Sequence, residues 1–148
     1  EIVKAQEMLA EQIVSIGKAY LKNDNYRKIA EKMIDDLYGY QEGPVLFKPT
    51  KACEKQFRMT REGALSYFIG GNVQFPEDHG FALKPWKKLR FENEGYIIDK
   101  THALTMGNYY FTDLNNNEIK VEFTIGYFIS CGGNLKIHLH HSSLPYKP

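Results

Sequence analysis

The sequence lacks the features that mark membrane-spanning, disulfide-rich and nucleic-acid-binding proteins. Its longest apolar stretches fall far short of the roughly 20 residues that a membrane-spanning helix needs. Its two cysteines, Cys53 and Cys131, stand in no CxxC or zinc-finger spacing, and they do not reveal whether they pair. The 19 basic and 18 acidic residues are scattered, which gives a net charge of +1 and no basic run for nucleic acid. A small neutral or singly charged substrate is therefore expected.

Several common catalytic motifs are absent as well. No glycine-rich phosphate loop, HExxH helix or GxSxG elbow occurs in the chain. Glu1 begins directly in a helical pattern without a signal-peptide profile, so we expect a targeting segment to have been removed or the domain to come from a longer chain. With 148 residues, of which 43% are hydrophobic and 25% charged, residues 1–148 suit one folded domain, which could be one unit of a multidomain chain.

The hydrophobic pattern of the first half predicts helices. Apolar residues recur at every third or fourth position over 2–21 and again over 26–37, so each segment should form an amphipathic helix. A brief strand is expected at 44–47, because this apolar piece is bounded by glycine and proline. A third, short helix should run from Thr60, whose hydroxyl can cap it, to Gly70, which can end it.

The second half of the chain predicts an antiparallel sheet. Linkers rich in Asn, Asp and Gly, which favour tight turns, separate candidate strands at 86–91, 96–99, 103–112, 119–129 and 135–143. Consecutive strands should therefore form hairpins. Helices followed by a strongly curved antiparallel sheet describe an α+β domain in which the helices cover one face of the sheet.

The last predicted strand holds the most unusual stretch, because three of the five histidines and two serines fall within residues 138–143. Side chains in a strand alternate between its two faces, so if Ile137 and Leu139 face the helices, His141 and Ser143 should also point inward. An inward polar pair needs hydrogen-bonding partners. Two interpretations stay open: the two side chains hydrogen-bond to each other, or they bind a ligand.

A metal site is the alternative use of the remaining histidines. In the same register His138 and His140 share the other face, and both could offer a nitrogen to zinc or manganese. No cysteine or carboxylate pattern completes a set of ligands for them. Imidazoles on the solvent face of the sheet are therefore the preferred interpretation.

Two hydroxyl residues elsewhere have ordinary structural explanations when only their residue types are considered. Tyr67 lies in the middle of the third predicted helix, where an aromatic ring usually packs in the core. Thr50 follows Pro49 in a predicted loop, where its hydroxyl could bond the local backbone. Neither residue indicates a catalytic site by itself.

Three segments of the chain resemble the iota-class carbonic anhydrases. These segments are EKQFRMTREGALSYFIGG at 54–71, EDHGFALKPW at 77–86 and HHSSLPY at 140–146, and the resemblance extends over nearly the whole chain. It implies a domain similar to the association domain of calcium/calmodulin-dependent kinase II. The fold expected from it is the NTF2-like or cystatin-like cone, with N-terminal helices packed on a strongly curved antiparallel sheet.

The resemblance also implies a reaction and a site. The expected reaction is the reversible hydration of carbon dioxide to bicarbonate, a carbonate dehydratase (lyase) activity, in a pocket between helices and sheet and with no metal cofactor. The residues expected to act in catalysis are Thr50, Tyr67, His141 and Ser143, and those expected to contact the substrate are Thr50, Tyr67, Ser142, Ser143 and Phe123. His141 or Tyr67 should help to deprotonate the attacking water, while Thr50 and Ser143 should donate hydrogen bonds to the oxygens that gain charge.

Three other functions stay open at this point. The domain could be a non-catalytic oligomerisation module, an isomerase or dehydratase that uses a carboxylate base on a larger substrate, or a carbonic anhydrase with zinc or manganese on His138, His140 or His141. The resemblance favours a homodimer through the outer face of the sheet, and no nucleic acid or membrane partner is expected. An algal plastid is the favoured compartment, with a bacterial periplasm or cytoplasm as the alternatives.

Overall fold

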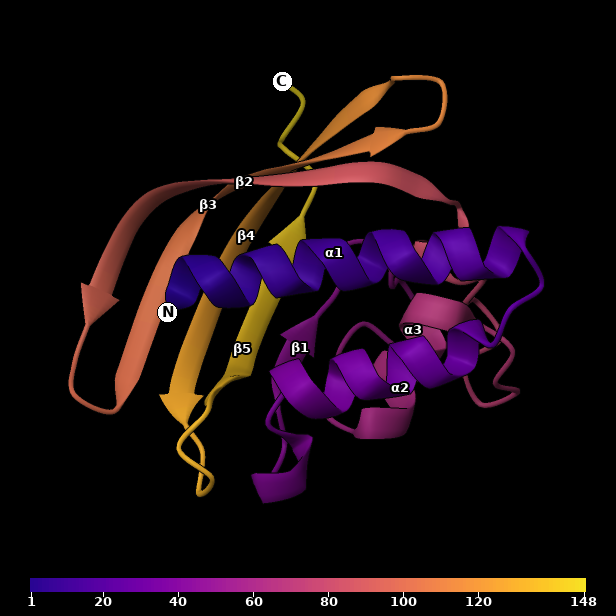
Figure 1. Ribbon diagram of the computed structural model, residues 1–148. Coiled ribbons are helices and arrows are strands. Elements are labelled where there is room, and N and C mark those ends of the chain that lie inside the picture. Colours follow the sequence, from indigo (N-terminus) through magenta and orange to yellow (C-terminus); the bar gives the residue numbers. More distant parts are fainter.

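Helices cover one face of a curved sheet in the computed structural model, which describes all residues from 1 to 148 (Figure 1). The first helix, α1 (Ile2–Leu21), crosses the sheet, and α2 (Tyr26–Leu37) and α3 (Arg61–Ile69) lie beside it. Two short 3₁₀ turns, η1 (Tyr40–Glu42) and η2 (Phe81–Leu83), complete the helical elements. The three helices expected from the sequence are therefore confirmed.

Local sequence signals explain where these helices lie and end. The apolar stripe of α1 faces the sheet, and Leu9 and Ile13 on it are at most 3% exposed. The Thr60 hydroxyl caps α3 by accepting a hydrogen bond from the backbone N–H of Gly63 at 3.2 Å. Gly70 ends this helix at a φ of 68°, a conformation that glycine adopts without strain. These caps fix the helix that carries Tyr67.

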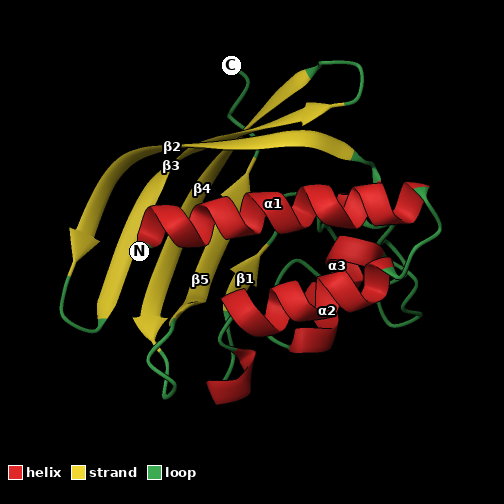
Figure 2. Ribbon diagram, in the orientation of Figure 1, coloured by secondary structure: helices red, strands yellow, loops and turns green.

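The sheet has five strands in the order β1, β5, β4, β3, β2 (Figure 2). The strands are β1 (Leu46–Lys48), β2 (Trp86–Ile98), β3 (His102–Asp113), β4 (Glu118–Ile129) and β5 (Leu135–Ser143). Strands β2 to β5 pair as antiparallel neighbours, which confirms the expected meander and the α+β architecture. Strand β1 begins two residues later than expected and pairs in parallel with β5 at the edge of the sheet.

One expected hairpin is a β-bulge instead. The predicted strands at 86–91 and 96–99 form the single strand β2, which pairs with β3 along its length and shifts register between Asn93 and Gly95. A side chain on Gly107, opposite the bulge, would collide with the backbone of β2, so only glycine permits this close approach. The predicted turn is wrong because Asn and Gly favour bulges as well as turns.

A second bulge, in β5, decides which of its side chains face the helices. Gly126 of β4 pairs with Leu139, whereas the next residue of β4, Tyr127, pairs with Ile137, so His138 is the extra residue. A Cβ atom on Gly126 would lie 3.1 Å from the Cβ of Leu139 and 3.2 Å from the ring of His138. Glycine in β4 therefore allows the bulge to pack closely against it.

The extra residue reverses the alternation of side chains beyond it. Ile137 is buried before the bulge, and after it His140 is 4% and Ser142 2% exposed, so both of these face the helices. His141 is exposed and Ser143 half-buried on the opposite, outer face. The expectations that His141 and Ser143 point inward and that His140 faces solvent are therefore wrong.

The hydrophobic core lies between α1, α2, α3 and the inner face of the sheet. It comprises 27 buried residues and is rich in aromatic rings, including those of Phe47, Phe68, Trp86, Tyr109 and Phe111. None of the helices combines the length and the apolar character that crossing a membrane requires. The core encloses a buried polar cluster that combines the imidazole of His140 with the hydroxyls of Tyr38 and Tyr109.

Candidate active site

A small cavity lies within the core, between the inner face of the sheet and α1 and α3. Its volume of about 20 Å³ exceeds the roughly 10–15 Å³ that one buried water molecule needs. Apolar side chains form most of the lining: Leu9, Ile13, Phe47, Pro49, Phe68, Phe81 and Phe111. The polar part of the lining is Thr50, Tyr67, Tyr109, His140 and Ser142. The cavity therefore offers hydroxyl and imidazole groups to a molecule of only a few heavy atoms.

The imidazole of His140 is the centre of a buried hydrogen-bond network. Its Nδ1 lies 2.9 Å from the hydroxyl of Tyr38, and its Nε2 lies 3.0 Å from the hydroxyl of Tyr109 and 3.2 Å from that of Ser142. The hydroxyls of Tyr109 and Ser142 are also hydrogen-bonded to each other. The ring of Phe47 stacks on the imidazole, with 5.0 Å between centroids. The network is thus enclosed by the core.

The hydrogen atoms of this network can be assigned by counting donors. His140 is the one hydrogen-bond partner of the Tyr38 hydroxyl, so that buried proton is satisfied only if it is donated to Nδ1. Nε2 then carries the imidazole proton and donates it toward Tyr109 or Ser142. These two hydroxyls share one hydrogen bond, which uses one of their two protons. The other proton remains as a donor that a ligand in the cavity can use.

Burial holds every ionisable group of this network neutral. Desolvation, with a smaller contribution from the charge of His141, lowers the pKa of His140 to about 3. Desolvation also raises the pKa of Tyr38, Tyr67 and Tyr109 well above the ordinary tyrosine value, despite hydrogen bonds that lower it for the last two. The cavity therefore presents neutral hydrogen-bond donors at neutral pH, and neither an imidazolium nor a phenolate.

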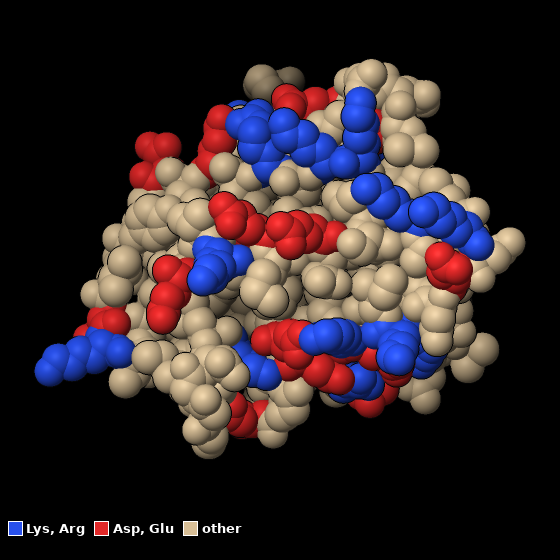
Figure 3. Space-filling model, viewed as in Figure 1, with Lys and Arg blue, Asp and Glu red and all other residues tan.

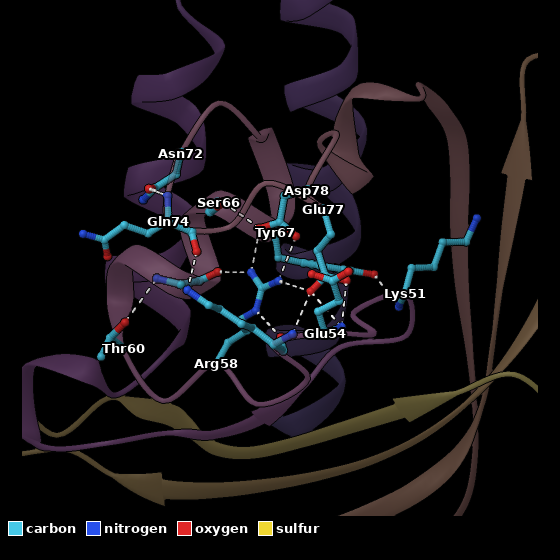
Figure 4. Close-up of polar contacts among 12 residues, drawn as sticks. Lys51, Glu54, Arg58, Thr60, Ser66, Tyr67, Asn72, Gln74, Glu77 and Asp78 are labelled. Atoms are coloured by element: carbon cyan, nitrogen blue, oxygen red, sulfur yellow. Dashed lines mark hydrogen bonds and ion pairs between the residues drawn. The ribbon is translucent and has the colours of Figure 1, made fainter.

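Thr50 and Tyr67 complete the polar side of the cavity. Thr50 follows β1, and its side chain approaches the hydroxyls of Tyr67 and Tyr109 closely enough to lower the pKa of each by hydrogen bonding. The backbone N–H of Lys51 donates to the Tyr67 hydroxyl at 3.3 Å (Figure 4). Because the Tyr67 oxygen accepts this bond, its own proton is free to be donated into the cavity.

A buried arginine holds the loops around Thr50 and Tyr67 in place (Figure 4). The guanidinium of Arg58 forms two hydrogen bonds with the carboxylate of Asp78, at 2.7 and 2.8 Å, and a third with the carbonyl oxygen of Gly63 at 2.8 Å. Asp78 also accepts the Ser66 hydroxyl at 2.6 Å. The carboxylate of Glu77 accepts three backbone N–H groups at 53–55. Segments 51–60 and 72–80 are thereby fixed to α3.

The structure brings together three of the residues predicted for the site, namely Thr50, Tyr67 and Ser142. Phe123 is buried but lies one layer behind the cavity, where its ring packs against Tyr109 with 5.0 Å between centroids. His141 and Ser143 lie on the outer face, where they line a separate hollow of about 510 Å³. A role for these two in the cavity is therefore not supported by their position.

Sequence reasoning missed two residues of the site. The alternation of the sequence places His140 on the solvent face, because nothing in the local sequence indicates the bulge that turns it inward. Tyr109 could have been found, since the alternation in β3 places Tyr109 and Phe111 on the same face, and both are 3% exposed.

The histidines do not converge on a metal site. His140 faces the core, whereas His138 lies on the outer face, where its ring stacks on those of Phe128 and His102 at 5.2 and 5.6 Å between centroids. Burial and the neighbouring charge of His102 lower the pKa of His138. No three side chains of His, Cys, Asp or Glu come together in a way that could hold a metal ion. The arrangement therefore does not favour the metal-bound alternative.

Helices that close a curled sheet into a cone around a polar cavity define the NTF2-like class of folds. Among solved structures, the chain matches an NTF2-like superfamily protein from Salmonella enterica with a TM-score of 0.51 and 11% identity, over 99% of this chain and 95% of that one. It matches a Xanthomonas campestris protein described as a calcium/calmodulin-dependent protein kinase II association domain with a TM-score of 0.66 and 21% identity, over 100% and 88% of the two chains. Both likenesses concern the fold alone.

The model of a family described as metal-independent carbonic anhydrase matches residues 1–144, and the chain belongs to this family. It is 45% identical over 150 residues to the metal-independent carbonic anhydrase of the cyanobacterium Nostoc sp. PCC 7120, over 99% of this chain and 73% of that protein. It matches the crystal structure of a cyanobacterial iota-carbonic anhydrase in complex with bicarbonate with a TM-score of 0.97 and 44% identity, over 100% and 92% of the chains. The resemblance found in the sequence is confirmed.

Proposed function

We propose that this chain catalyses the reversible hydration of carbon dioxide to bicarbonate in the cavity formed by Thr50, Tyr67, Tyr109, His140 and Ser142. The observation that carries the proposal is the size and lining of the cavity, which combines about 20 Å³ with several neutral hydroxyl donors. Pockets for larger organic molecules usually measure about 300–1,000 Å³. No aspartate or glutamate lines the cavity, so it lacks the carboxylate base that an isomerase or dehydratase would use.

The two sides of the cavity suit the two forms of the substrate. The apolar wall formed by Phe47, Phe68 and Phe111 accommodates carbon dioxide, which has no charge to solvate. The hydroxyls of Thr50, Tyr67 and Ser142 can donate hydrogen bonds to the oxygens that become negative as bicarbonate forms. These bonds are strong because the apolar wall excludes bulk water. The cyanobacterial relative was crystallised with bicarbonate bound.

The reaction forms a bond between a water oxygen and the carbon of carbon dioxide, and one O–H bond of that water breaks. Bulk water has a pKa of about 15.7, so its proton must leave as the new bond forms. His140 cannot keep this proton, because its pKa of about 3 makes the imidazolium unfavourable. The position of His141 removes it as the expected base, and the raised pKa of Tyr67 favours its role as a donor. We infer that the hydroxyls pass the proton outward while His140 holds Tyr109 and Ser142 in place.

Dimerisation through the outer face of the sheet is a further part of the proposal. Cross-strand pairing aligns Ile97, Leu104, Gly126, Leu139 and Leu46 in one row over all five strands. Three of these side chains are 41–69% exposed. A contiguous row of exposed apolar side chains favours an interface, and a second copy would cover the row symmetrically. The plastid location and the algal source stay predictions.

Stopped-flow carbon dioxide hydration tests the reaction. The protein is stripped with a chelator, its metal content is measured by mass spectrometry, and the wild type is compared with Tyr67→Phe. We expect activity to survive stripping and kcat/KM of the variant to fall about 10²-fold, as after loss of one donor to a developing oxyanion. Activity that returns only with zinc or manganese would support the metal-bound alternative. No hydration under any condition would support a non-catalytic oligomerisation domain.

A further inference from the structure

A second, larger hollow adjoins the cavity and opens to solvent. Its volume is about 460 Å³, and Tyr67 and Phe81 line both it and the cavity. The two rings stack with 5.4 Å between centroids and 16° between their planes, so they form the wall that separates the hollow from the cavity. Tyr67 belongs to α3 and Phe81 to η2. The Tyr67 hydroxyl lies at this wall, because it accepts a hydrogen bond at 3.3 Å from the backbone N–H of Lys51, which also lines the hollow.

The acidic side chains around this hollow are already bound to other groups of the protein, whereas its two lysines have no ion-pair partner. Its two acidic side chains already have partners, because backbone N–H groups hold Glu77 and lower its pKa, while Arg58 and Ser66 hold Asp78. The two lysines keep their charges available: Lys84 lies over the ring of Trp86 at 4.5 Å, and the side chain of Lys51 extends away from the Arg58 network (Figure 4). The charges in this hollow that have no ion-pair partner are therefore those of the two lysines.

One imidazole, that of His79, lines the hollow. Its backbone packs against the end of α3, since a Cβ on Gly70 would lie 3.1 Å from the His79 carbonyl carbon. Its side chain is exposed to solvent, unlike that of His140. The charged groups that share the hollow with His79 are Lys51, Lys84, Glu77 and Asp78. Imidazole is the side chain that most readily exchanges protons near neutral pH.

We propose, resting on the proposed function, that His79 accepts the proton of each hydration turnover and passes it to buffer. Hydration converts one carbon dioxide and one water into bicarbonate and one proton, so every turnover must export that proton. The broken O–H bond of the attacking water delivers it to the hydroxyls of the cavity, and Tyr67 relays it across the wall to water in the hollow. A ring nitrogen of His79 then binds it, and a buffer molecule removes it to restore the neutral imidazole.

The proposal predicts a split between two kinetic parameters in His79→Gln. At low concentration of a buffer that is not imidazole, we expect kcat of carbon dioxide hydration to fall roughly tenfold, less than the 10²–10⁴ attributed to a direct general base, since water and buffer partly replace the relay. The value of kcat/KM should stay near that of the wild type, because it reports the steps up to formation of bicarbonate. Added imidazole should restore kcat. His102→Gln, an exposed histidine at the far end of β3, is the matched control.

Three other outcomes are distinguishable, and each would overturn either the role of His79 or the proposed reaction. A kcat of His79→Gln equal to that of the wild type at low buffer would remove His79 from the proton route. An equal fall of kcat and kcat/KM that imidazole does not restore would show a structural role for His79, which also overturns the proposal. An inactive wild-type protein would instead overturn the proposed function, and the proton route with it.

Discussion

The two neighbouring serines at the end of β5 face opposite sides of the sheet. Ser142 is 2% exposed and hydrogen-bonds Tyr109 and His140, whereas Ser143 lines the outer hollow. Ser142→Ala should therefore lower kcat/KM for carbon dioxide hydration about 10²-fold, because the cavity loses a hydroxyl that can donate to the developing negative charge. Ser143→Ala is the matched control and should hydrate carbon dioxide like the wild type. Equal losses in the two variants would contradict the inward position of Ser142.

The buried imidazole of His140 makes folding depend on pH. Its pKa falls from the ordinary 6.5 to about 3 in the folded chain, so between these values the unfolded state binds more protons than the folded state. The contribution of neutral His140 to stability is complete above pH 6.5 and is lost as the pH falls toward 3. Because one pKa unit corresponds to about 1.4 kcal/mol, a decrease from pH 7 to pH 5 should remove about 2 kcal/mol of the free energy of unfolding.

Urea unfolding at a series of pH values measures this dependence. His140→Gln should flatten the curve between pH 7 and pH 5, although the variant will be less stable throughout, because it disturbs the hydrogen bonds to Tyr38 and Tyr109. His79→Gln removes an exposed imidazole from the loop that follows α3 and should leave the slope of the wild type unchanged. An identical slope in His140→Gln and the wild type would show that another group causes the effect.

At the scale of elements, the sequence predicts the helices well because their signals are local. The 3.6-residue periodicity of α1 and α2 and the caps at Thr60 and Gly70 lie within or next to the helices themselves. The two bulges are different, because each depends on a glycine in a neighbouring strand, Gly107 in β3 or Gly126 in β4. Local alternation therefore predicts the strands of the sheet. It does not predict which face of the sheet a side chain occupies beyond a bulge.

The same distinction explains the predicted site. Thr50 and Tyr67 were found through the resemblance to a family, and the residue types alone gave each an ordinary structural role. The strand alternation selected His141 and Ser143 in place of His140 and Ser142, because one extra residue at His138 reverses the faces. The predicted segment thus supplies two residues to the lining of the cavity, and the error in choosing them is one residue of register.

The buried ion pair between Arg58 and Asp78, which fixes segments 51–60 and 72–80, should contribute measurably to stability. Asp78→Asn would remove the carboxylate that binds the guanidinium of Arg58 directly, and it would leave this side chain, which is 0% exposed, with only the more distant carboxylate of Glu77 at 3.8 Å. Breaking a buried ion pair in this way usually costs about 3–5 kcal/mol. Activity should fall as well, because the loop of Lys51 and the position of Tyr67 depend on these contacts. Urea unfolding and the hydration assay measure the two effects.

A second arginine pair supplies the control for this prediction. Arg61 also binds a carboxylate through two nitrogens, with distances of 2.7 and 3.0 Å to Asp35, but it joins α3 to α2 at the surface, where the side chains are 33% and 40% exposed. Asp35→Asn should therefore cost no more than about 1 kcal/mol. Similar losses for Asp35→Asn and Asp78→Asn would argue that burial of Arg58 does not determine the cost.

At the scale of the whole molecule, the two faces of the sheet differ: the inner face lines the cavity, and the outer face carries an exposed apolar row. The inner face and the helices close around the cavity, so all the residues that line it belong to one chain. On the helix side, basic side chains gather along the upper edge and the upper right of the view, and charges of both signs are mixed in its lower part (Figure 3). The outer face instead carries the apolar row that includes Ile97, Leu104, Leu139 and Leu46. Association is therefore expected at the outer face, away from the cavity.

Leu104→Glu tests this expectation, because Leu104 lies in the row and is 41% exposed. Burying a carboxylate without a partner is unfavourable, so the variant should sediment as a single chain of 17.1 kDa under conditions in which the wild type sediments at twice this mass. Val73→Glu, at a position in the 72–80 segment that is 92% exposed, should remain a dimer. The monomeric variant should keep most of its hydration activity, since no residue of the cavity belongs to the row. A wild type that sediments as a single chain would contradict the dimer, and a dimeric Leu104→Glu would move the interface to another face.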